Sequence, residues 1–195
     1  MEINACPRDS TTALSFPVAT MPRLQGAYTE LEQETLEFFV QFRRPVLRYV
    51  CGLGVTVHDG EEIAQEVFLA LFRHLCCGQS RRNLRAWVFR VAHNLALKQR
   101  YADQKARGRT AGGEFSMETR IDPEMDPEER MVYLQRRFRL LAVVSALPEK
   151  DQCCLRLRAE GLRYREIARA LNISLGAVSI SLTRSLARLQ SADRA

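Results

Sequence analysis

The chain has 195 residues, of which 46% are hydrophobic and 27% charged, and its formal net charge is +6. This hydrophobic content supports a folded core and excludes wholesale disorder. No apolar run reaches the ~18–20 residues of a membrane span, and no charged segment precedes an apolar stretch at the N-terminus. We therefore expect no signal peptide, no membrane insertion and a cytoplasmic location.

The chain contains six cysteines: Cys6, Cys51, Cys76, Cys77, Cys153 and Cys154. None shows the spacing of a zinc ribbon, although His74 lies close to two of them. We expect no metal site and no cofactor, and we interpret the cysteines as buried, reduced thiols. Redox sensing by the adjacent pairs is the alternative.

The net charge conceals three blocks along the chain. Residues 81–109 hold nine lysines and arginines against one acid, and residues 130–195 hold thirteen against five. Residues 110–129 between them hold seven acids against one arginine. Two basic blocks around an acidic one favour a polyanionic partner such as nucleic acid, and a solvated charged surface is the alternative.

The N-terminal part of the chain predicts a tail and then a helix. Residues 1–26 contain three prolines and no apolar period, which predicts a disordered tail. Apolar residues then recur at helical spacing from about 30 to 50. Pro45 lies inside this run and predicts a kink or a break.

The stretch HDGEEIAQEVFLALFRHL predicts a second helix, with Asp59 as its N-cap and Glu62 in a capping box. A third helix is predicted over 84–101, and three helices of this length can share one small core. Residues 103–127 lack an apolar period and predict a linker. Asp126, as an N-cap before a proline, then restarts a helix.

The stretch REIARALNISLGAVSISL predicts a helix-turn-helix from helices at about 164–171 and 175–190. A preceding helix ends at Gly161, Asn172 can adopt the left-handed corner, and Ser174 is a natural N-cap. No strand-like alternation occurs. The predicted fold is therefore all-α, with two small helical bundles joined by a flexible acidic linker.

The outward face of the second of these helices carries polar and small residues. Ser179 and Thr183 can donate hydrogen bonds to phosphates, and Ile180 can contact a thymine methyl group. Arg184 and Arg188 can reach phosphates or bases. This face predicts DNA binding, and a helical hairpin packed on a neighbour is the alternative.

Three stretches resemble, in order and spacing, the extracytoplasmic-function (ECF) group of the sigma-70 family: DGEEIAQEVFLALFRHL, LRAWVFRVAHNLALKQR and LPEKDQCCLRLRAEGLRYREIARALNISLGAVSISLTRSLARL. Members of this group are bacterial RNA polymerase initiation factors reduced to two domains. The resemblance implies sigma region 2 over 27–102 and sigma region 4 over 128–195. It also implies three partners, namely core RNA polymerase (its β′ clamp helices and β subunit), promoter DNA and an anti-sigma factor.

The resemblance assigns roles to residues of region 2. The residues implied to dock on the polymerase are Glu62, Gln65, Glu66 and Arg73. The alternative role for these side chains is solvation and capping of the helix. Capture of the −10 promoter element as single-stranded DNA falls to the basic loop and the helix after it, and the candidates are Arg81, Arg82, Asn83, Arg85, Trp87, Arg90, His93, Asn94 and Lys98. Trp87 either stacks on a base or belongs to the core, and we favour the core.

The resemblance assigns reading of the −35 element to region 4. The candidates are Tyr164, Arg165, Ser174, Gly176, Ala177, Ser179, Ile180, Thr183, Arg184 and Arg188. The acidic linker matches in position a connector near the RNA exit path of the polymerase, where its charge could mimic nucleic acid. An ordinary flexible linker is the alternative.

The chain departs from the family pattern at three positions. Arg163 stands where a serine or threonine usually caps a helix, and losing such a cap costs about 1 kcal/mol. Ser179 and Ser181 stand at commonly basic positions, and each lost phosphate contact would flatten the salt dependence of binding by about one counterion. We therefore expect weaker or differently specified −35 recognition.

These observations predict an alternative sigma factor that binds core RNA polymerase, directs it to −10 and −35 elements, and has no catalytic residues. One rival is a free-standing helix-turn-helix regulator, which leaves residues 30–102 unexplained. Another is an enzyme on a helical bundle, which would need convergent acid–base or metal ligands that the sequence does not offer.

Overall fold

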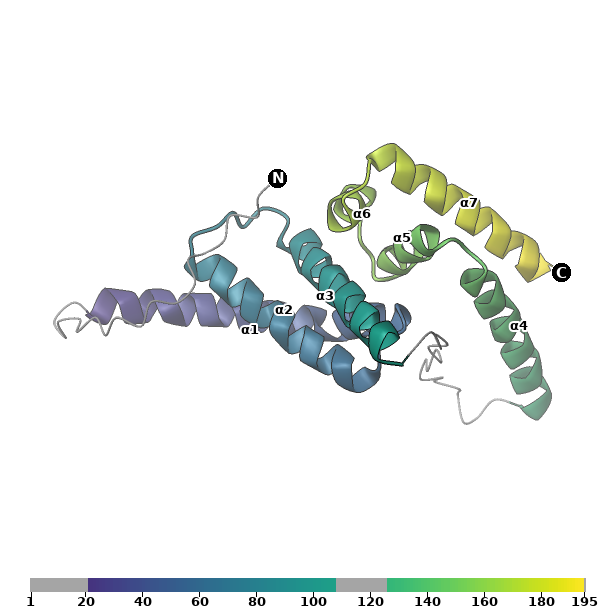
Figure 1. Cartoon of the computed structure of the whole chain (residues 1–195), viewed down its shortest axis with the longest axis horizontal. Helices are drawn as coiled ribbons and strands as arrows, with labels where there is room; N and C mark the ends of the chain where they lie inside the picture. The colour runs from purple at the N-terminus through teal and green to yellow at the C-terminus, as the bar shows by residue number, and fades with distance from the viewer. Residues whose placement is uncertain (1–20, 108–125, 195) are drawn as a thin grey trace.

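The computed structural model describes residues 21–107 and 126–194, and these residues form seven α-helices and no strand (Figure 1). The helices are α1 (Met21–Gly52), α2 (Val57–Cys76), α3 (Leu84–Arg107), α4 (Pro127–Ser145), α5 (Glu149–Ala159), α6 (Tyr164–Leu171) and α7 (Leu175–Arg194). Most of the predicted tail, most of the predicted linker and Cys6 lie outside the described residues. None of the helices within them is long and apolar enough to cross a membrane.

Helix α1 is longer than predicted at its start and is not broken inside. It begins at Met21, within the segment predicted as a tail, and the same helix continues past Pro45 to Gly52. The predicted break at Pro45 is therefore wrong. A proline removes one backbone hydrogen-bond donor from the helix. The next turn is nevertheless buried, since Val46, Tyr49 and Val50 are almost fully covered, and this burial stabilises the continuous helix.

The predicted N-cap of α2 is also wrong, because the helix starts three residues earlier. Thr56 has an extended backbone, and its side-chain oxygen accepts a hydrogen bond from the Asp59 backbone N–H at 3.2 Å. The Thr56 hydroxyl in turn donates to the Asp59 carboxylate at 2.6 Å. Asp59 therefore supports the cap from inside the first turn, where its charge suits the helix dipole.

Helices α1, α2 and α3 form an N-terminal unit around a common core, as predicted. Val67 and Leu71 of α2 and Val88 and Phe89 of α3 are fully buried. The ring of Tyr49 meets that of Phe89 edge to face, with centroids 5.7 Å apart. This geometry is favourable for aromatic pairs and fixes α1 against α3.

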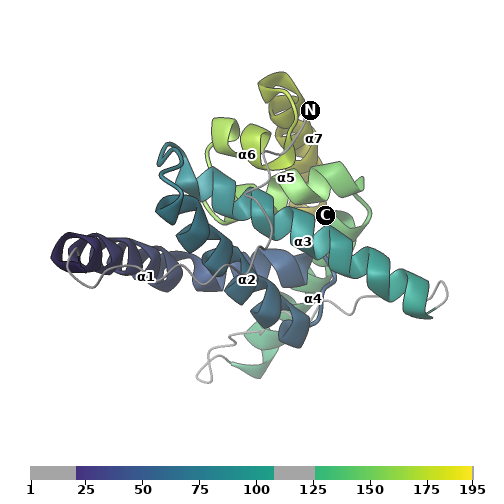
Figure 2. The same cartoon turned by 60° about the vertical axis from the view of Figure 1, so that its left-hand side comes forward.

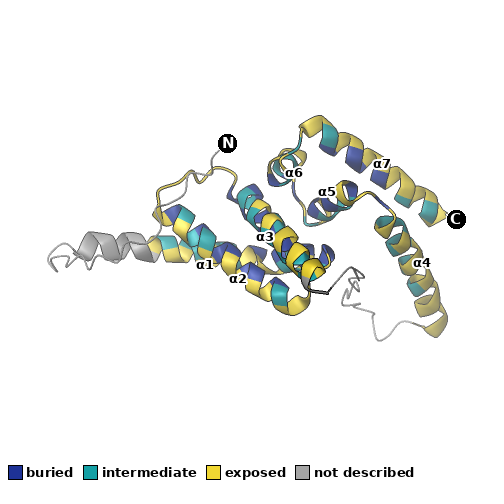
Figure 3. Cartoon of the chain, in the orientation of Figure 1, coloured by how far each residue is buried: buried dark blue, intermediate teal, exposed yellow. Residues whose placement is uncertain are grey.

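Helices α4 to α7 form a C-terminal unit. Leu157, Ile167, Val178 and Leu182 are fully buried where α5, α6 and α7 meet. Helix α4 packs mainly along α7 and has no buried residue between Pro127 and Ser145 (Figure 3). The described part of the chain thus contains both predicted helical bundles.

The two units also pack on each other, which the sequence did not predict. Helix α3 lies against α6 (Figure 2). Helix α1 also contacts α5, and one hydrophobic cluster contains buried residues of both units. The two predicted bundles are therefore not separate bodies in this structure, and both candidate DNA-binding surfaces lie close to this contact.

The interpretation of the cysteines as buried holds for only part of the set. Cys153 and Cys154 are buried, but Cys76 and Cys77 are exposed where α2 ends, and Cys51 is half-buried. Burial raises the pKa of Cys153 to about 11, so this thiol stays protonated at neutral pH and is a poor nucleophile. Among the described residues, no group of three or more histidines, cysteines and acids could hold a metal ion.

Candidate polymerase and nucleic-acid interfaces

The predicted polymerase-docking residues form one exposed stripe on α2. Glu62, Gln65, Glu66 and Arg73 are all exposed, because the apolar positions of α2 turn the opposite face into the core. Sequence reasoning missed Leu69, which lies between them and is 57% exposed. The sequence did contain a signal for Leu69, because this apolar residue lies outside the four-residue period that marks the buried face of α2. We call these five residues the α2 stripe.

Six of the predicted −10 residues are exposed along the loop before α3 and the outer side of that helix. They are Arg81, Arg82, Asn83, Arg90, Asn94 and Lys98. Asn83 has a left-handed backbone, with φ of 61°, and its carbonyl accepts the Trp87 N–H at 3.1 Å, which starts α3. The last three share one face because they follow one another at four-residue steps.

The other three predicted −10 residues are turned inward. Arg85 donates to the backbone carbonyl of Glu160 at 2.7 Å, and its guanidinium lies 5.5 Å from the ring centroid of Phe42. His93 Nδ1 lies 2.9 Å from the hydroxyl of Tyr49, and burial lowers the pKa of His93. Trp87 is half-buried against the core, its ring centroid 4.6 Å from that of His74. In this arrangement Arg85 and His93 are half-buried and held by contacts inside the protein, and Trp87 packs against the core as the favoured interpretation expects.

The helix-turn-helix has the corner and cap that the sequence predicted. Asn172 adopts the left-handed conformation, with φ of 53° and ψ of 47°. Ser174 caps α7, since its side-chain oxygen accepts the Ala177 N–H at 3.1 Å. Although Arg163 offers no capping oxygen, the carboxylate of Glu166 accepts the Arg163 N–H at 2.6 Å, which satisfies one terminal donor of α6.

The outward face of α6 and α7 presents most of the predicted −35 residues. Ile180 is 67% exposed, and the other exposed members are Tyr164, Arg165, Ser174, Gly176, Ser179, Thr183 and Arg188. Ala177 is half-buried. A cleft of about 750 Å³ runs from this face to Asn83 of the N-terminal unit.

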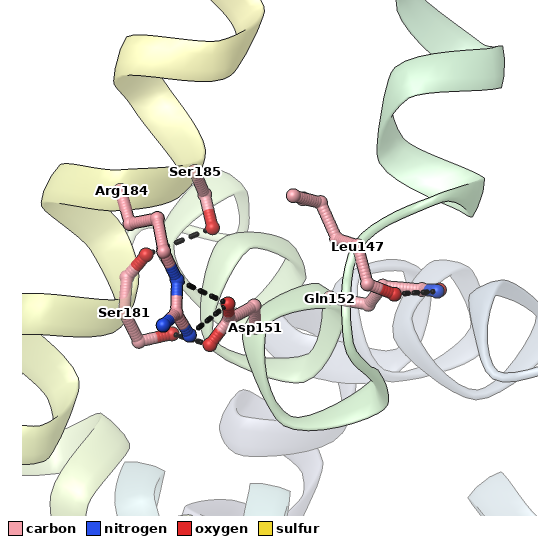
Figure 4. Close-up of polar contacts among 6 residues, drawn as sticks. All are labelled: Leu147, Asp151, Gln152, Ser181, Arg184 and Ser185. Atoms are coloured by element: carbon pink, nitrogen blue, oxygen red, sulfur yellow. Dashed lines mark hydrogen bonds and ion pairs between the residues drawn. The ribbon is translucent and has the colours of Figure 1, made fainter.

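Arg184 differs from these residues because its guanidinium is held by a buried carboxylate (Figure 4). Asp151 of α5 is 1% exposed, and its Oδ2 accepts Arg184 Nε–H at 3.0 Å and also an Nη2–H. The Ser181 hydroxyl donates to Asp151 Oδ1 at 2.7 Å, and the Ser185 hydroxyl donates to the Ser181 carbonyl at 2.8 Å. Arg184, predicted to reach phosphates or bases, is therefore engaged by Asp151 although its side chain stays 49% exposed, whereas Ser181 is buried and donates toward α5.

Opposing effects set the charge of Asp151. Burial alone would raise the pKa of its carboxyl, but hydrogen bonds from Ser181 and Arg184, with the positive charges of Arg184 and Arg188, outweigh it. The net result is a pKa below the ordinary value, so the carboxylate is ionised at neutral pH. An ionised Asp151 can therefore hold α7 against α5.

The arrangement is a helix-turn-helix unit with a second basic surface on the loop before α3 and on α3, and an exposed stripe on α2. Residues 38–107 match the family model for sigma-70 region 2, and residues 137–189 match that for sigma-70 region 4. The chain belongs to the ECF group of the sigma-70 family, whose members direct RNA polymerase in transcription initiation.

Curated relatives give the same family. The chain is 35% identical over 143 residues to the ECF RNA polymerase sigma factor ShbA of Streptomyces griseus, covering 70% of this chain and 73% of ShbA. It is 28% identical over 134 residues to the ECF sigma factor SigW of Bacillus subtilis, covering 66% and 72%. Against SigE of Mycolicibacterium smegmatis it is 28% identical, over 74% of this chain and 56% of SigE.

Solved structures share the fold. The sigma factor RpoE of Bartonella quintana, solved with the anti-sigma factor NepR, matches with a TM-score of 0.58 over 83% of this chain and 96% of that one, at 17% identity. CnrH, solved with the cytosolic domain of CnrY, matches with a TM-score of 0.57 over 86% of this chain and 92% of that one, also at 17% identity.

Proposed function

We propose that this alternative sigma factor docks on core RNA polymerase through the α2 stripe and reads a promoter at two places. The surface from Arg81 to Lys98 captures the −10 element, and the outward face of α6 and α7 reads the −35 element. The observation that carries this proposal is that one chain presents two basic surfaces, one from Arg81 to Lys98 and one on α6 and α7, together with the exposed α2 stripe. The protein acts in the cytoplasm and performs no catalysis of its own. Its two domains are region 2 over 27–102 and region 4 over 128–195.

The −10 surface has the chemistry that an unpaired DNA strand requires. Arg81, Arg82, Arg90 and Lys98 supply positive charge for phosphates, and the amides of Asn83 and Asn94 can hydrogen-bond base edges. Exposed bases are available for such contacts only when the duplex is open. The surface therefore favours melted −10 DNA.

The −35 surface offers less positive charge for DNA phosphates than the arginines of its sequence implied. With Arg184 engaged by Asp151, Arg188 is the other arginine of α7 between Gly176 and Leu189, and its exposed side chain can reach a phosphate. Thr183 and Ser179 can donate hydrogen bonds, and exposed Ile180 can contact a thymine methyl group. We therefore propose modest −35 affinity, supplemented by the hold of the polymerase on the promoter.

The partners follow from the same surfaces. The β′ clamp helices of the polymerase are the proposed target of the α2 stripe, and the β subunit is a further contact. Both solved neighbours are complexes with another protein: RpoE with the anti-sigma factor NepR, and CnrH with the cytosolic domain of CnrY. We propose that an anti-sigma factor also controls this chain by covering its polymerase-binding faces.

Replacing Gln65 and Glu66 together with alanine should weaken binding to core polymerase about tenfold or more, because two central polar contacts of the α2 stripe are lost. Fluorescence anisotropy with labelled protein and purified core polymerase measures the change. Glu32→Ala/Gln33→Ala on α1 removes the same two side-chain types from another exposed surface and should leave affinity unchanged. Equal affinity of both double variants would contradict the docking surface.

Replacing Arg188 with alanine should reduce −35-dependent promoter binding by the holoenzyme about three- to tenfold and lower the slope of log affinity against log salt by about 0.9. Filter binding at a series of salt concentrations measures both quantities. Arg139→Ala on exposed α4 removes the same charge away from the proposed surface and serves as the control. A salt slope unchanged in the Arg188 variant would remove this residue from the DNA interface.

A further inference from the structure

The Arg184 side chain is half exposed, yet its guanidinium is bonded to a buried carboxylate. Asp151 Oδ2 accepts the Arg184 Nε–H at 3.0 Å and a further N–H from Nη2 (Figure 4). A guanidinium has five N–H donors, so these two bonds leave three for other partners. The side chain of Arg184 is 49% exposed and that of Asp151 is 1% exposed. The guanidinium is therefore held from inside the protein and can be reached from outside it.

The carboxylate that holds Arg184 is itself held in place by α7. The Ser181 hydroxyl donates to Asp151 Oδ1 at 2.7 Å, so both carboxylate oxygens accept hydrogen bonds from this helix. The Ser185 hydroxyl donates to the Ser181 carbonyl at 2.8 Å, and both serines are buried. A buried polar network whose members are paired is rigid. The Asp151 carboxylate therefore has little freedom to rotate, and it gives the Arg184 guanidinium one favoured orientation.

The place of Arg184 on α7 directs the rest of its side chain toward the proposed −35 surface. Ile180 lies one turn before it and Arg188 one turn after it, and all three residues are exposed. Residues at four-residue steps share one face of a helix. Arg184 therefore lies between a proposed contact to a thymine methyl group and a proposed contact to a phosphate.

Pairing with Asp151 also changes what Arg184 offers to DNA. Asp151 is ionised at neutral pH, so the two side chains together carry no net charge. An unpaired arginine attracts the phosphates of DNA of any sequence, and a neutral pair adds little to that attraction. The remaining N–H donors still point in a fixed direction, and directed arginine donors distinguish one base from another in the major groove. The pairing therefore favours sequence discrimination over general affinity.

We propose that Asp151 is a positioning residue for promoter recognition, which orients the Arg184 guanidinium toward the −35 element and suppresses its attraction to DNA of other sequences. The inference rests on the proposed function, because it assumes that the outward face of α6 and α7 reads that element. Arg184 makes the contact, and Asp151 acts through Arg184 without touching DNA. Ser181 supports the carboxylate from the same helix.

Replacing Asp151 with asparagine tests the proposal, because it keeps the size of the side chain and removes its charge. The probes are a promoter fragment that the protein selects in run-off transcription and the same fragment with its −35 element scrambled. Holoenzyme containing full-length Asp151→Asn should bind the scrambled fragment about two- to threefold more tightly than wild type does, with a salt slope steeper by up to about 0.9. Its preference for the intact fragment should fall about tenfold, because Arg184 loses its fixed orientation.

Two further variants separate orientation from charge. Arg184→Lys keeps the positive charge beside Asp151 but loses the planar fork, so the preference should fall without tighter binding to the scrambled fragment. Asp193→Asn removes an acidic charge from the end of the same helix, where Asp193 pairs with Arg136, and should change neither quantity. Filter binding at a series of salt concentrations measures all the variants, and circular dichroism measures their folded fraction.

The outcomes distinguish this inference from the proposed function on which it rests. A preference that is unchanged in Asp151→Asn, or that is lost together with affinity for the scrambled fragment, would overturn the positioning role and leave Asp151 as a structural anchor. If Asp151→Asn does not fold, Arg184→Lys decides, since an unchanged preference in that variant would also overturn the inference. Wild-type holoenzyme that binds both fragments equally would instead reject the −35 surface of the proposed function.

Discussion

Replacing Asp151 with alanine should lower the free energy of unfolding by about 2–3 kcal/mol. The substitution removes the acceptor for the buried Ser181 hydroxyl and for the Arg184 guanidinium, and hydrogen bonds to a charged group contribute about 1.5–3 kcal/mol each. Arg184 is half exposed and can recover part of this loss from water. Urea denaturation followed by circular dichroism measures the change, and −35-dependent transcription should fall with it because α7 loses its anchor on α5.

A matched pair elsewhere in the C-terminal unit provides the control. Asp193 also binds an arginine, Arg136, at 2.5 Å, but both side chains reach solvent. Exposed ion pairs contribute about 0–1 kcal/mol, so Asp193→Ala should cost much less than Asp151→Ala. Equal losses in the two variants would show that the buried carboxylate does not hold the recognition helix.

The pH dependence of the same variant tests the ionisation of Asp151. Because the pKa of Asp151 is lowered in the folded protein, its stabilisation is present above the unfolded value of about 3.9 and is lost as the pH falls through the folded pKa. The difference in stability between wild type and Asp151→Asn should therefore be constant near neutrality and shrink below about pH 4. A difference independent of pH down to pH 2 would argue against a charged Asp151.

Combining Asn83→Gly with Arg90→Ala should reduce promoter opening about 30- to 100-fold while closed-complex formation changes little. Loss of an amide contact and a charge-assisted contact to the melted strand would together cost about 2–3 kcal/mol. Glycine is the informative substitution at Asn83, since it keeps the left-handed backbone and removes only the side chain. Permanganate footprinting of unpaired thymines measures opening, and a gel-shift assay on ice measures the closed complex.

The exposed Arg44 of α1 supplies a charge control for this experiment, because it lies outside the proposed surfaces. Arg44→Ala should open the promoter as well as the wild type does. If the Asn83/Arg90 variant gives a full permanganate pattern, the −10 surface lies elsewhere. If it loses closed-complex formation to the same degree, the two residues act before melting.

Local features of the chain were predictable because neighbouring residues determine them. The corner at Asn172 and the cap at Ser174 depend on backbone conformations that these side chains favour, and both are present. The exposed side of α2 follows from the four-residue period of its apolar face. Where two nearby residues compete for one role, the prediction was less secure, and Thr56 caps α2 in place of Asp59.

The interactions that were missed join residues far apart in the chain. Arg184 reaches Asp151 across 33 positions, and Arg85 reaches Glu160 across 75. Nothing in the local pattern distinguishes an arginine that binds a buried carboxylate from one that faces DNA. The predicted −35 set therefore contains one arginine that also binds a buried carboxylate, and the predicted −10 set contains one that also bonds to the other unit.

Run-off transcription with purified core polymerase on fragments of genomic DNA tests the central claim most directly. The proposed function predicts discrete transcripts that appear only when this protein is added and that start downstream of a common pair of sequence elements. The Gln65→Ala/Glu66→Ala variant should yield far fewer of them. Transcripts identical with and without the protein would contradict a role in promoter selection.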